Sequence, residues 1–229
     1  MKLACIRQPG YLPYMGFFKK IQSSDIFVYL DDTKFVEHGW DNRNKIKTDQ
    51  GSMWLTVPIK RVSQQLLKDV LIANNESWKN KHLRSIKINY TKAPFFNDCW
   101  DDLSEIFLKD WNNLIDLNLN LIKYFNQKLE IITKTIRSSE LQINSSGTKR
   151  LVEICQNVGA TTYLSGIVGK EYLDENLFKE AGIKIIYENF KHPIYKQLGN
   201  DFLPNMSIID LLFNEGPNSS ELIRKSLNF

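Results

Sequence analysis

The sequence predicts an α/β fold with an open, largely parallel sheet, flanking helices and a helical insertion. Residues 3–8 (LACIRQ) and 25–32 (DIFVYLDD) are short apolar runs typical of buried strands, and a segment with helical spacing separates them. The hydrophobic period turns helical from about residue 75 to 130, and alternating strand-like and helix-like segments follow. The length of 229 residues fits a single α/β domain, 1–229, with the helical region as an insertion.

The first unit has the order strand, loop, helix, strand. In residues 14–25, Met15, Phe18 and Ile21 recur at helical spacing, and Lys19 and Lys20 are expected to face outward. Residues 34–73 then contain the shorter patterns NKIKT, MWLTVPI and KDVLIA, broken by DQGS and by a proline. These patterns predict hairpins in a β-rich arm.

The helical insertion, about 75–130, predicts three helices, the first two separated by TKAPFF. Strand candidates follow at 131–141, 161–166 and 183–190, separated by amphipathic segments at 148–159 and 170–182. Residues 207–227 indicate two short helices around Gly216 and Pro217. Periodicity does not decide whether these last helices pack on the core or on a second chain, so an oligomer stays open.

Composition limits the partners and the compartment. The balance of 30 Lys and Arg against 26 Asp and Glu suits an anionic ligand but lacks the concentrated basic face of a nucleic-acid binder, so no nucleic-acid partner is expected. The three cysteines are scattered, which argues against disulfides or a zinc knuckle and favours a cytoplasmic location. No apolar run approaches the roughly 20 residues of a membrane span. No residue is assigned as a metal ligand, and a metal requirement stays open.

The opening loop is the first candidate site. Ligands of open α/β sheets bind beyond the carboxyl ends of the strands, and this loop follows the first strand. Gln8 supplies an amide, Tyr11 and Tyr14 supply hydroxyls on flat rings, and Gly16 lets backbone approach a ligand near a helix start. The alternative is that prolines and aromatic rings only stabilise a tight turn.

Two further candidates follow the second strand. Asp31 or Asp32 can orient a hydroxyl, accept a proton or help to hold a metal, although a carboxylate at a strand end is as often a helix cap or an arginine partner. In the stretch HGWDNRNKIKT, cations suit phosphate oxygens and an indole can stack on a base or sugar. The candidates there are Trp40, Asn42, Arg43 and Lys45, and the alternative is a solvated strand face.

Histidines supply the candidate acid or base. His192 follows the last strand candidate together with Tyr195 and Gln197, so we prefer it to His82, which is expected on the polar side of its helix as a further substrate contact. A lone histidine is nevertheless usually structural.

The junction at Ser165 and Gly166 offers backbone N–H groups to an anion, although ordinary helix capping explains it nearly as well. It matches neither a P-loop nor the GxSxG pattern of hydrolases.

Several motifs together resemble the WbqC-like protein family, from the first strand to about Asn214. They are QPGYLPYMGFF, FVYLDD, NRNKIKT with WLTVPI, RLVEICQNVGATTYLSG and HPIYKQ with SIIDLLFN. Two positions depart from the usual pattern: Tyr14 replaces a Trp, and Arg7 replaces a frequent His. The resemblance implies a role in surface-polysaccharide (O-antigen) synthesis, with N-acyl or aminoacyl transfer, for example of glycine, to the amino group of a nucleotide-linked amino sugar.

A more distant resemblance links the opening unit to the HIGH-motif superfamily of Rossmann-like adenylate-forming enzymes. Tyr14 and Phe17 stand where that superfamily has two histidines, so ATP use does not follow. The cofactor is therefore unassigned, with ATP or another activated acyl donor both open.

Within this hypothesis each candidate has a role. Arg43 and Lys45 hold the diphosphate, and Tyr11 or Trp40 lies against a ring. His192 takes the proton of the attacking amine, oriented by Asp32 or Tyr195, and backbone donors near Gly166 stabilise the oxyanion. The alternative is a non-catalytic partner that binds a nucleotide sugar or glycan within a biosynthetic complex.

Overall fold

The centre of the computed structural model is a five-stranded parallel sheet, and the structure describes residues 1–61, 63–74 and 77–226. The strand order is β5-β2-β1-β6-β7. The strands are β1 (Leu3–Arg7), β2 (Ile26–Tyr29), β5 (Lys134–Arg137), β6 (Thr162–Gly166) and β7 (Lys184–Glu188). The chain runs outward from β1 in one direction and from β6 in the other, which is the doubly wound order. The predicted α/β class is confirmed.

Both faces of the sheet are covered, which explains the continuous apolar runs in its strands. All four residues of β2 are buried, as are four of the five in β1. Helix α1 (Met15–Ser23) packs on one face through the cluster that contains Cys5 and Phe27. Helices α5 (Gly147–Asn157) and α6 (Glu175–Glu180) pack on the other, with Ala4 and Val28.

The region predicted as a β-rich arm contains a hairpin. Strands β3 (Arg43–Thr48) and β4 (Gly51–Thr56) form an antiparallel hairpin that is separate from the main sheet. The third pattern, 68–73, contains no strand; a short 3-10 helix, η1 (Leu67–Asp69), and isolated bridges such as Ile59 to Ile72 occupy this region. Val70 and Ile72 face the core from irregular backbone, so an alternating pattern here did not mean a strand. Residue 62 of the predicted arm lies outside the described residues.

The three predicted insertion helices are confirmed as α2 (Trp78–Tyr90), α3 (Phe96–Leu108) and α4 (Leu114–Lys128). Residue 75, where the insertion was predicted to begin, lies outside the described residues. Buried residues of all three helices belong to the same apolar cluster as α1 and its face of the sheet. The insertion and the sheet therefore share a core.

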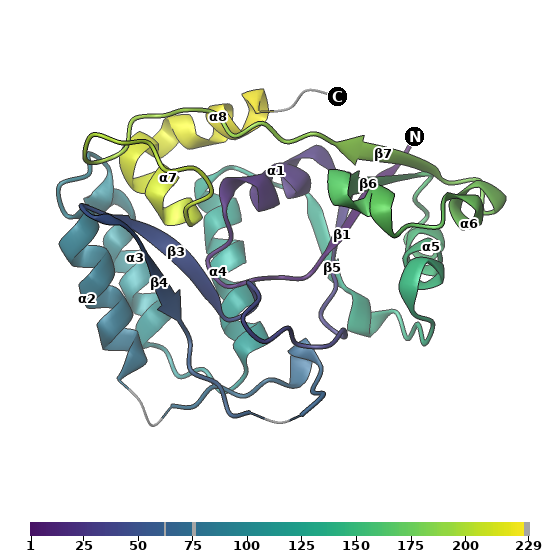
Figure 1. Ribbon diagram of the computed structural model, residues 1–229, viewed down its shortest axis with the longest axis horizontal. Helices are drawn as coiled ribbons and strands as arrows, with labels where there is room; N and C mark the ends of the chain where they lie inside the picture. The colour runs from purple at the N-terminus through teal and green to yellow at the C-terminus, as the bar shows by residue number, and fades with distance from the viewer. Residues whose placement is uncertain (62, 75–76, 227–229) are drawn as a thin grey trace.

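The C-terminal segment returns across α1 after β7 (Figure 1). Helices α7 (Ile208–Glu215) and α8 (Ser219–Lys225) confirm the two short helices predicted there. Gly216 separates them with φ of 50°, and a side chain on it would meet the ring of Phe95 at 2.4 Å. This turn therefore requires glycine.

Two expectations about helix faces were wrong. Lys19 and Lys20 are buried, because α8 and the end of β7 cover the side of α1 that was expected to face water. His82 is buried as well, between Trp78 and Phe107, because α2 turns this side toward the shared core. In the described part of the chain, no helix is long and apolar enough to cross a membrane.

Candidate functional site

A cavity of about 840 Å³ lies at the carboxyl edge of the sheet, where β1 and β6 are neighbours and the chain leaves them in opposite directions. This is the topological switch point, the usual ligand position in doubly wound sheets. Seven of the residues predicted for substrate binding line it, and they come from three separate segments. They are Gln8, Tyr11, Tyr14, Trp40, Lys45, Ser165 and Gly166.

Local polar contacts hold the opening loop in place. The Asn44 amide on β3 donates to the carbonyl oxygens of Leu12 at 2.7 Å and of Tyr11 at 3.3 Å. Leu12 has a φ of 45°, a backbone conformation that is unfavourable for leucine and that this contact supports. The amide of Gln8 donates to the hydroxyl of Thr33 at 2.8 Å. The loop therefore presents a fixed surface to the cavity.

The cavity wall combines cations, one carboxylate and several aromatic rings. Arg7, Lys20 and Lys45 supply the cations, and Asp41 supplies the carboxylate. Burial raises the pKa of Asp41, although the backbone N–H of Val36 donates to it. The excess of cations favours an anionic ligand, and the rings of Tyr14, Trp40, Tyr163 and Tyr172 offer apolar surface for a base or sugar.

An exposed aromatic pair lies beside the cavity on the hairpin side. The rings of Trp40 and Trp54 are 5.2 Å apart, and Trp40 is 53% exposed although it lines the cavity. The Arg43 guanidinium lies 4.3 Å from the Trp54 ring centre, and Lys45 Nζ lies 4.9 Å from it. This arrangement can stack a flat ring next to a cation.

Two of the predicted substrate-binding residues, Asn42 and Arg43, donate hydrogen bonds to backbone carbonyl oxygens of the protein. Arg43 does not line the cavity, and it donates to the carbonyl oxygens of Gly39 and His38. Asn42 donates to the carbonyl of Val57 at 2.9 Å. Lys45 is thus the predicted phosphate-binding residue that the structure places in the cavity wall.

His192 and Tyr195 lie outside the cavity wall, in a neighbouring cluster. Asp210 is its centre: it accepts hydrogen bonds from Tyr195 at 2.7 Å, Tyr90 at 2.8 Å and Gln197 at 2.8 Å. Burial raises the pKa of Asp210 against the effect of these donors. The ring of His192 stacks on Tyr195 with a centroid distance of 6.1 Å.

The ring of Phe190 connects this cluster to the cavity, because it lies 5.8 Å from His192 and 5.9 Å from Tyr14. Burial lowers the pKa of His192, so its imidazole is neutral near pH 7. Its Nδ1 lies 2.8 Å from the carbonyl oxygen of Pro193, which suits an Nδ1–H donor and leaves Nε2 as the acceptor.

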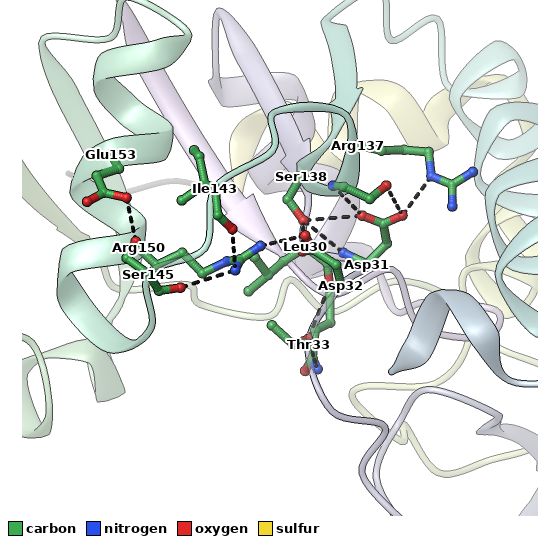
Figure 2. Close-up of polar contacts among 12 residues, drawn as sticks. Leu30, Asp31, Asp32, Thr33, Arg137, Ser138, Ile143, Ser145, Arg150 and Glu153 are labelled. Carbon is green, nitrogen blue, oxygen red and sulfur yellow. Dashed lines mark hydrogen bonds and ion pairs between the residues drawn. The ribbon is translucent and has the colours of Figure 1, made fainter. Parts of the chain in front are cut away.

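The aspartate pair belongs to a separate polar cluster at the ends of β2 and β5. Figure 2 shows Asp32 between the Ser138 hydroxyl and Arg150, whose Nη2 is 2.6 Å from an Asp32 oxygen. Asp31 is fully buried and accepts from Arg137 Nε at 2.7 Å. Burial opposes ionisation of Asp31, but hydrogen bonds from Ser139 and Arg137 together lower its pKa. No contact among the described residues joins Asp32 to His192.

His82 and Gly16 also lie away from the cavity. The Tyr11 hydroxyl is 2.8 Å from His82 Nδ1, and burial lowers the pKa of His82 to about 4. A Cβ on Gly16 would lie 2.5 Å from the Tyr14 ring, so this glycine makes room for a ring that lines the cavity.

Sequence reasoning missed three charged residues of the wall: Arg7, Lys20 and Asp41. Asp41 stands between Trp40 and Asn42, so a scan for carboxylates in that stretch would have found it. Cys5 also lines the cavity, but burial raises the pKa of its thiol to about 11, so it is protonated near pH 7. Among the described residues, no group of three or more His, Cys, Asp or Glu side chains could hold a metal ion.

Comparisons with known proteins match nearly the whole chain. The profile of the WbqC-like protein family matches residues 8–222, which include the opening loop, the hairpin and the aspartate pair. A relative from Mycobacterium tuberculosis (strain ATCC 25618 / H37Rv), "Uncharacterized protein Rv1507c", is 36% identical over 228 residues, 98% of each chain. No solved structure matches this chain.

Proposed function

The chain belongs to the WbqC-like protein family, and from this we propose that it acts in surface-polysaccharide (O-antigen) synthesis, on a nucleotide-linked amino sugar bound in the switch-point cavity. The proposed reaction is transfer of an acyl or aminoacyl group, for example glycyl, to the amino group of the sugar. The observation that carries the proposal is the cavity itself, where cations and aromatic rings meet at the carboxyl edge of β1 and β6.

In this proposal the nucleotide binds on the hairpin side. Lys45 contacts the diphosphate, and the exposed ring of Trp40 stacks on the base or the sugar. Tyr14 and Tyr172 line the rest of the space available to the sugar. Arg43 acts through Trp54, whose ring it covers, and it contributes positive potential near the diphosphate.

The proposed chemistry is attack of the sugar amine on the acyl carbonyl carbon. As the C–N bond forms, His192 Nε2 accepts the proton of the attacking nitrogen, and the activating group of the acyl donor then leaves. Backbone N–H groups near Gly166 stabilise the oxyanion of the tetrahedral intermediate. Because the rings of Phe190 and Tyr14 separate His192 from the cavity, this step requires these rings to move when substrate binds.

The first experiment is a thermal-shift screen with UDP-, GDP- and dTDP-linked sugars, including 4-amino sugars, with ATP, acetyl-CoA and glycine as co-ligands. A ligand at 100 times its Kd stabilises the folded state by about 2.7 kcal/mol, or roughly 5–11 °C for a chain of this size. A selective shift would identify the nucleotide and direct a mass-spectrometric search for the acylated sugar. The absence of a shift with every compound would contradict the proposal.

The binding-partner hypothesis also has an observation in its favour, because His192, Asp32 and Tyr195 do not line the cavity. The His192→Gln variant separates the two functions. For an acyltransferase we expect turnover to fall while nucleotide-sugar affinity is retained. Retained affinity in a wild-type protein that forms no product with any donor would favour the binding partner.

A further inference from the structure

A buried ion pair lies in the wall of the cavity. Lys20 on α1 contacts a carboxylate oxygen of Glu188, the last residue of β7, and both side chains are less than 5% exposed. Lys20 lines the cavity, and Glu188 is the register neighbour of Gly166 on β6. Lys20 Nζ lies 3.8 Å from the position that a Gly166 Cβ would take. The pair therefore lies over the carboxyl end of β6, at the switch point.

The hydrogen bonds of this pair are incomplete. An ammonium carries three N–H groups, and among the described residues Glu188 is the acceptor that Lys20 Nζ has. The second carboxylate oxygen, Glu188 Oε1, is buried and has no hydrogen-bond partner there. A buried ion pair is stabilising only when its remaining donors and acceptors are satisfied. Lys20 lines the cavity, so its remaining N–H groups can donate to an acceptor on a bound ligand, whereas Glu188 Oε1 requires a donor that an anion does not supply.

We propose that Lys20 binds an oxyanion of the substrate, a carboxylate or a phosphate, and that Glu188 is the positioning residue that directs the ammonium toward it. Arg7 supports the oxyanion with a second positive charge. It lines the cavity two positions after Cys5 on β1, so both side chains project to the α1 face of the sheet. This inference rests on the proposed function, because it takes the cavity as the substrate site.

The adjacent lysine provides a matched control. Lys19 is as buried as Lys20, but it donates to the carbonyl oxygen of Arg224 at 2.8 Å and does not line the cavity. The two lysines thus share helix, burial and charge, and they differ in access to the cavity. A response confined to Lys20 would report a site and not a general effect of salt.

The test is ¹⁵N NMR of the lysine side-chain ammonium groups in the full chain. The Lys20 resonance is assigned with Lys20→Arg, and the wild-type protein is titrated with sodium pyrophosphate and, separately, with sodium acetate, each against sodium chloride at equal ionic strength. We expect a saturable shift of the Lys20 resonance and no shift of Lys19. A response to pyrophosphate identifies the oxyanion as a phosphate, and a response to acetate identifies it as a carboxylate.

Thermal unfolding provides a second measurement, which does not require the Lys20 ammonium resonance to be observed. The double variant Lys20→Met with Glu188→Gln removes both charges together, which avoids an unpaired buried charge. We expect it to fold but to lose the thermal stabilisation that the effective anion gives the wild type, while Lys19→Met keeps that stabilisation.

Two results would overturn the inference: no Lys20 shift beyond chloride, or an anion response that survives in the double variant. An anion response at Lys20 without any response to nucleotide sugars would instead reject the proposed function and leave the oxyanion site standing.

Discussion

Removing the Asp32 carboxylate tests whether this residue serves stability or catalysis. Asp32 and Arg150 form an ion pair at 2.6 Å, and their side chains are 12% and 13% exposed. Breaking a buried pair by removing one partner costs about 3–5 kcal/mol, because the other charge is left uncompensated. Because both side chains are slightly exposed, we expect a cost near the lower end of this range: Asp32→Ala should lower the free energy of unfolding by ~3 kcal/mol.

The assay is urea unfolding followed by circular dichroism, together with thermal unfolding. A loss of ~3 kcal/mol corresponds to a fall in Tm of roughly 6–12 °C for a chain of this length. The matched control is Asp102→Ala, which removes a carboxylate 61% exposed that pairs with Lys128 at 3.0 Å. Exposed pairs contribute only about 0–1 kcal/mol, so this variant should unfold almost like the wild type.

A variant of Arg150, the partner of Asp32, distinguishes a structural role of Asp32 from a catalytic one. Arg150 also donates to the carbonyl oxygens of Ile143 at 3.0 Å and Ser145 at 3.2 Å, so it ties the start of α5 to the end of β2 (Figure 2). The double variant Asp32→Leu with Arg150→Met should recover much of the lost stability, because no unpaired charge remains. Wild-type stability in Asp32→Ala combined with abolished product formation would refute this structural role.

Three further predictions concern His82, Gly16 and Trp40. Burial lowers the pKa of His82 to about 4, so the unfolded chain takes up a proton below pH 6.5 that the folded protein does not. Stability should therefore fall as the pH drops, by roughly 2 kcal/mol from this group at pH 5, and urea unfolding of His82→Gln should lack this component. Gly16→Ala should displace the Tyr14 ring and weaken nucleotide-sugar binding in calorimetry, with circular dichroism unchanged. Trp40→Ala should weaken the same binding by about 1–3 kcal/mol without lowering Tm, since Trp40 is half exposed; unchanged affinity would remove it from the site.

The fold was predictable because its signals are local. Strands β1 and β2 are short apolar runs followed by turn residues, and the insertion keeps a helical period over three helices. The segment 68–73 was not predictable in the same way. Leu71 and Ile72 pair with Asn113 and Ile59 through isolated bridges, so long-range contacts determine its conformation.

The position of the cavity was predictable from topology, because a loop that follows the first strand of a doubly wound sheet lies at the carboxyl edge. The polar side chains within it were harder to assign. Asp32 contacts Ser138 and Arg150, which follow it by more than a hundred positions in the sequence. The local sequence pattern therefore could not decide between a catalytic role and an ion pair for Asp32. The candidates on the opening loop and the hairpin lie close together, since the Asn44 amide on the hairpin donates to the carbonyl oxygen of Leu12 in the loop.

Lys20 shows how a wrong expectation about a helix face can point to a candidate ligand contact. Amphipathic patterning assumes that the polar side of a helix faces water, but β7 and α8 enclose that side of α1. Lys19 donates to a backbone carbonyl, whereas Lys20 donates to one oxygen of the Glu188 carboxylate, whose other oxygen has no partner among the described residues. Packing alone would favour an apolar residue at both positions, because burying a charge lowers stability. Lys20 lines the cavity with a single acceptor among the described residues, and the proposed ligand explains this arrangement better than packing does.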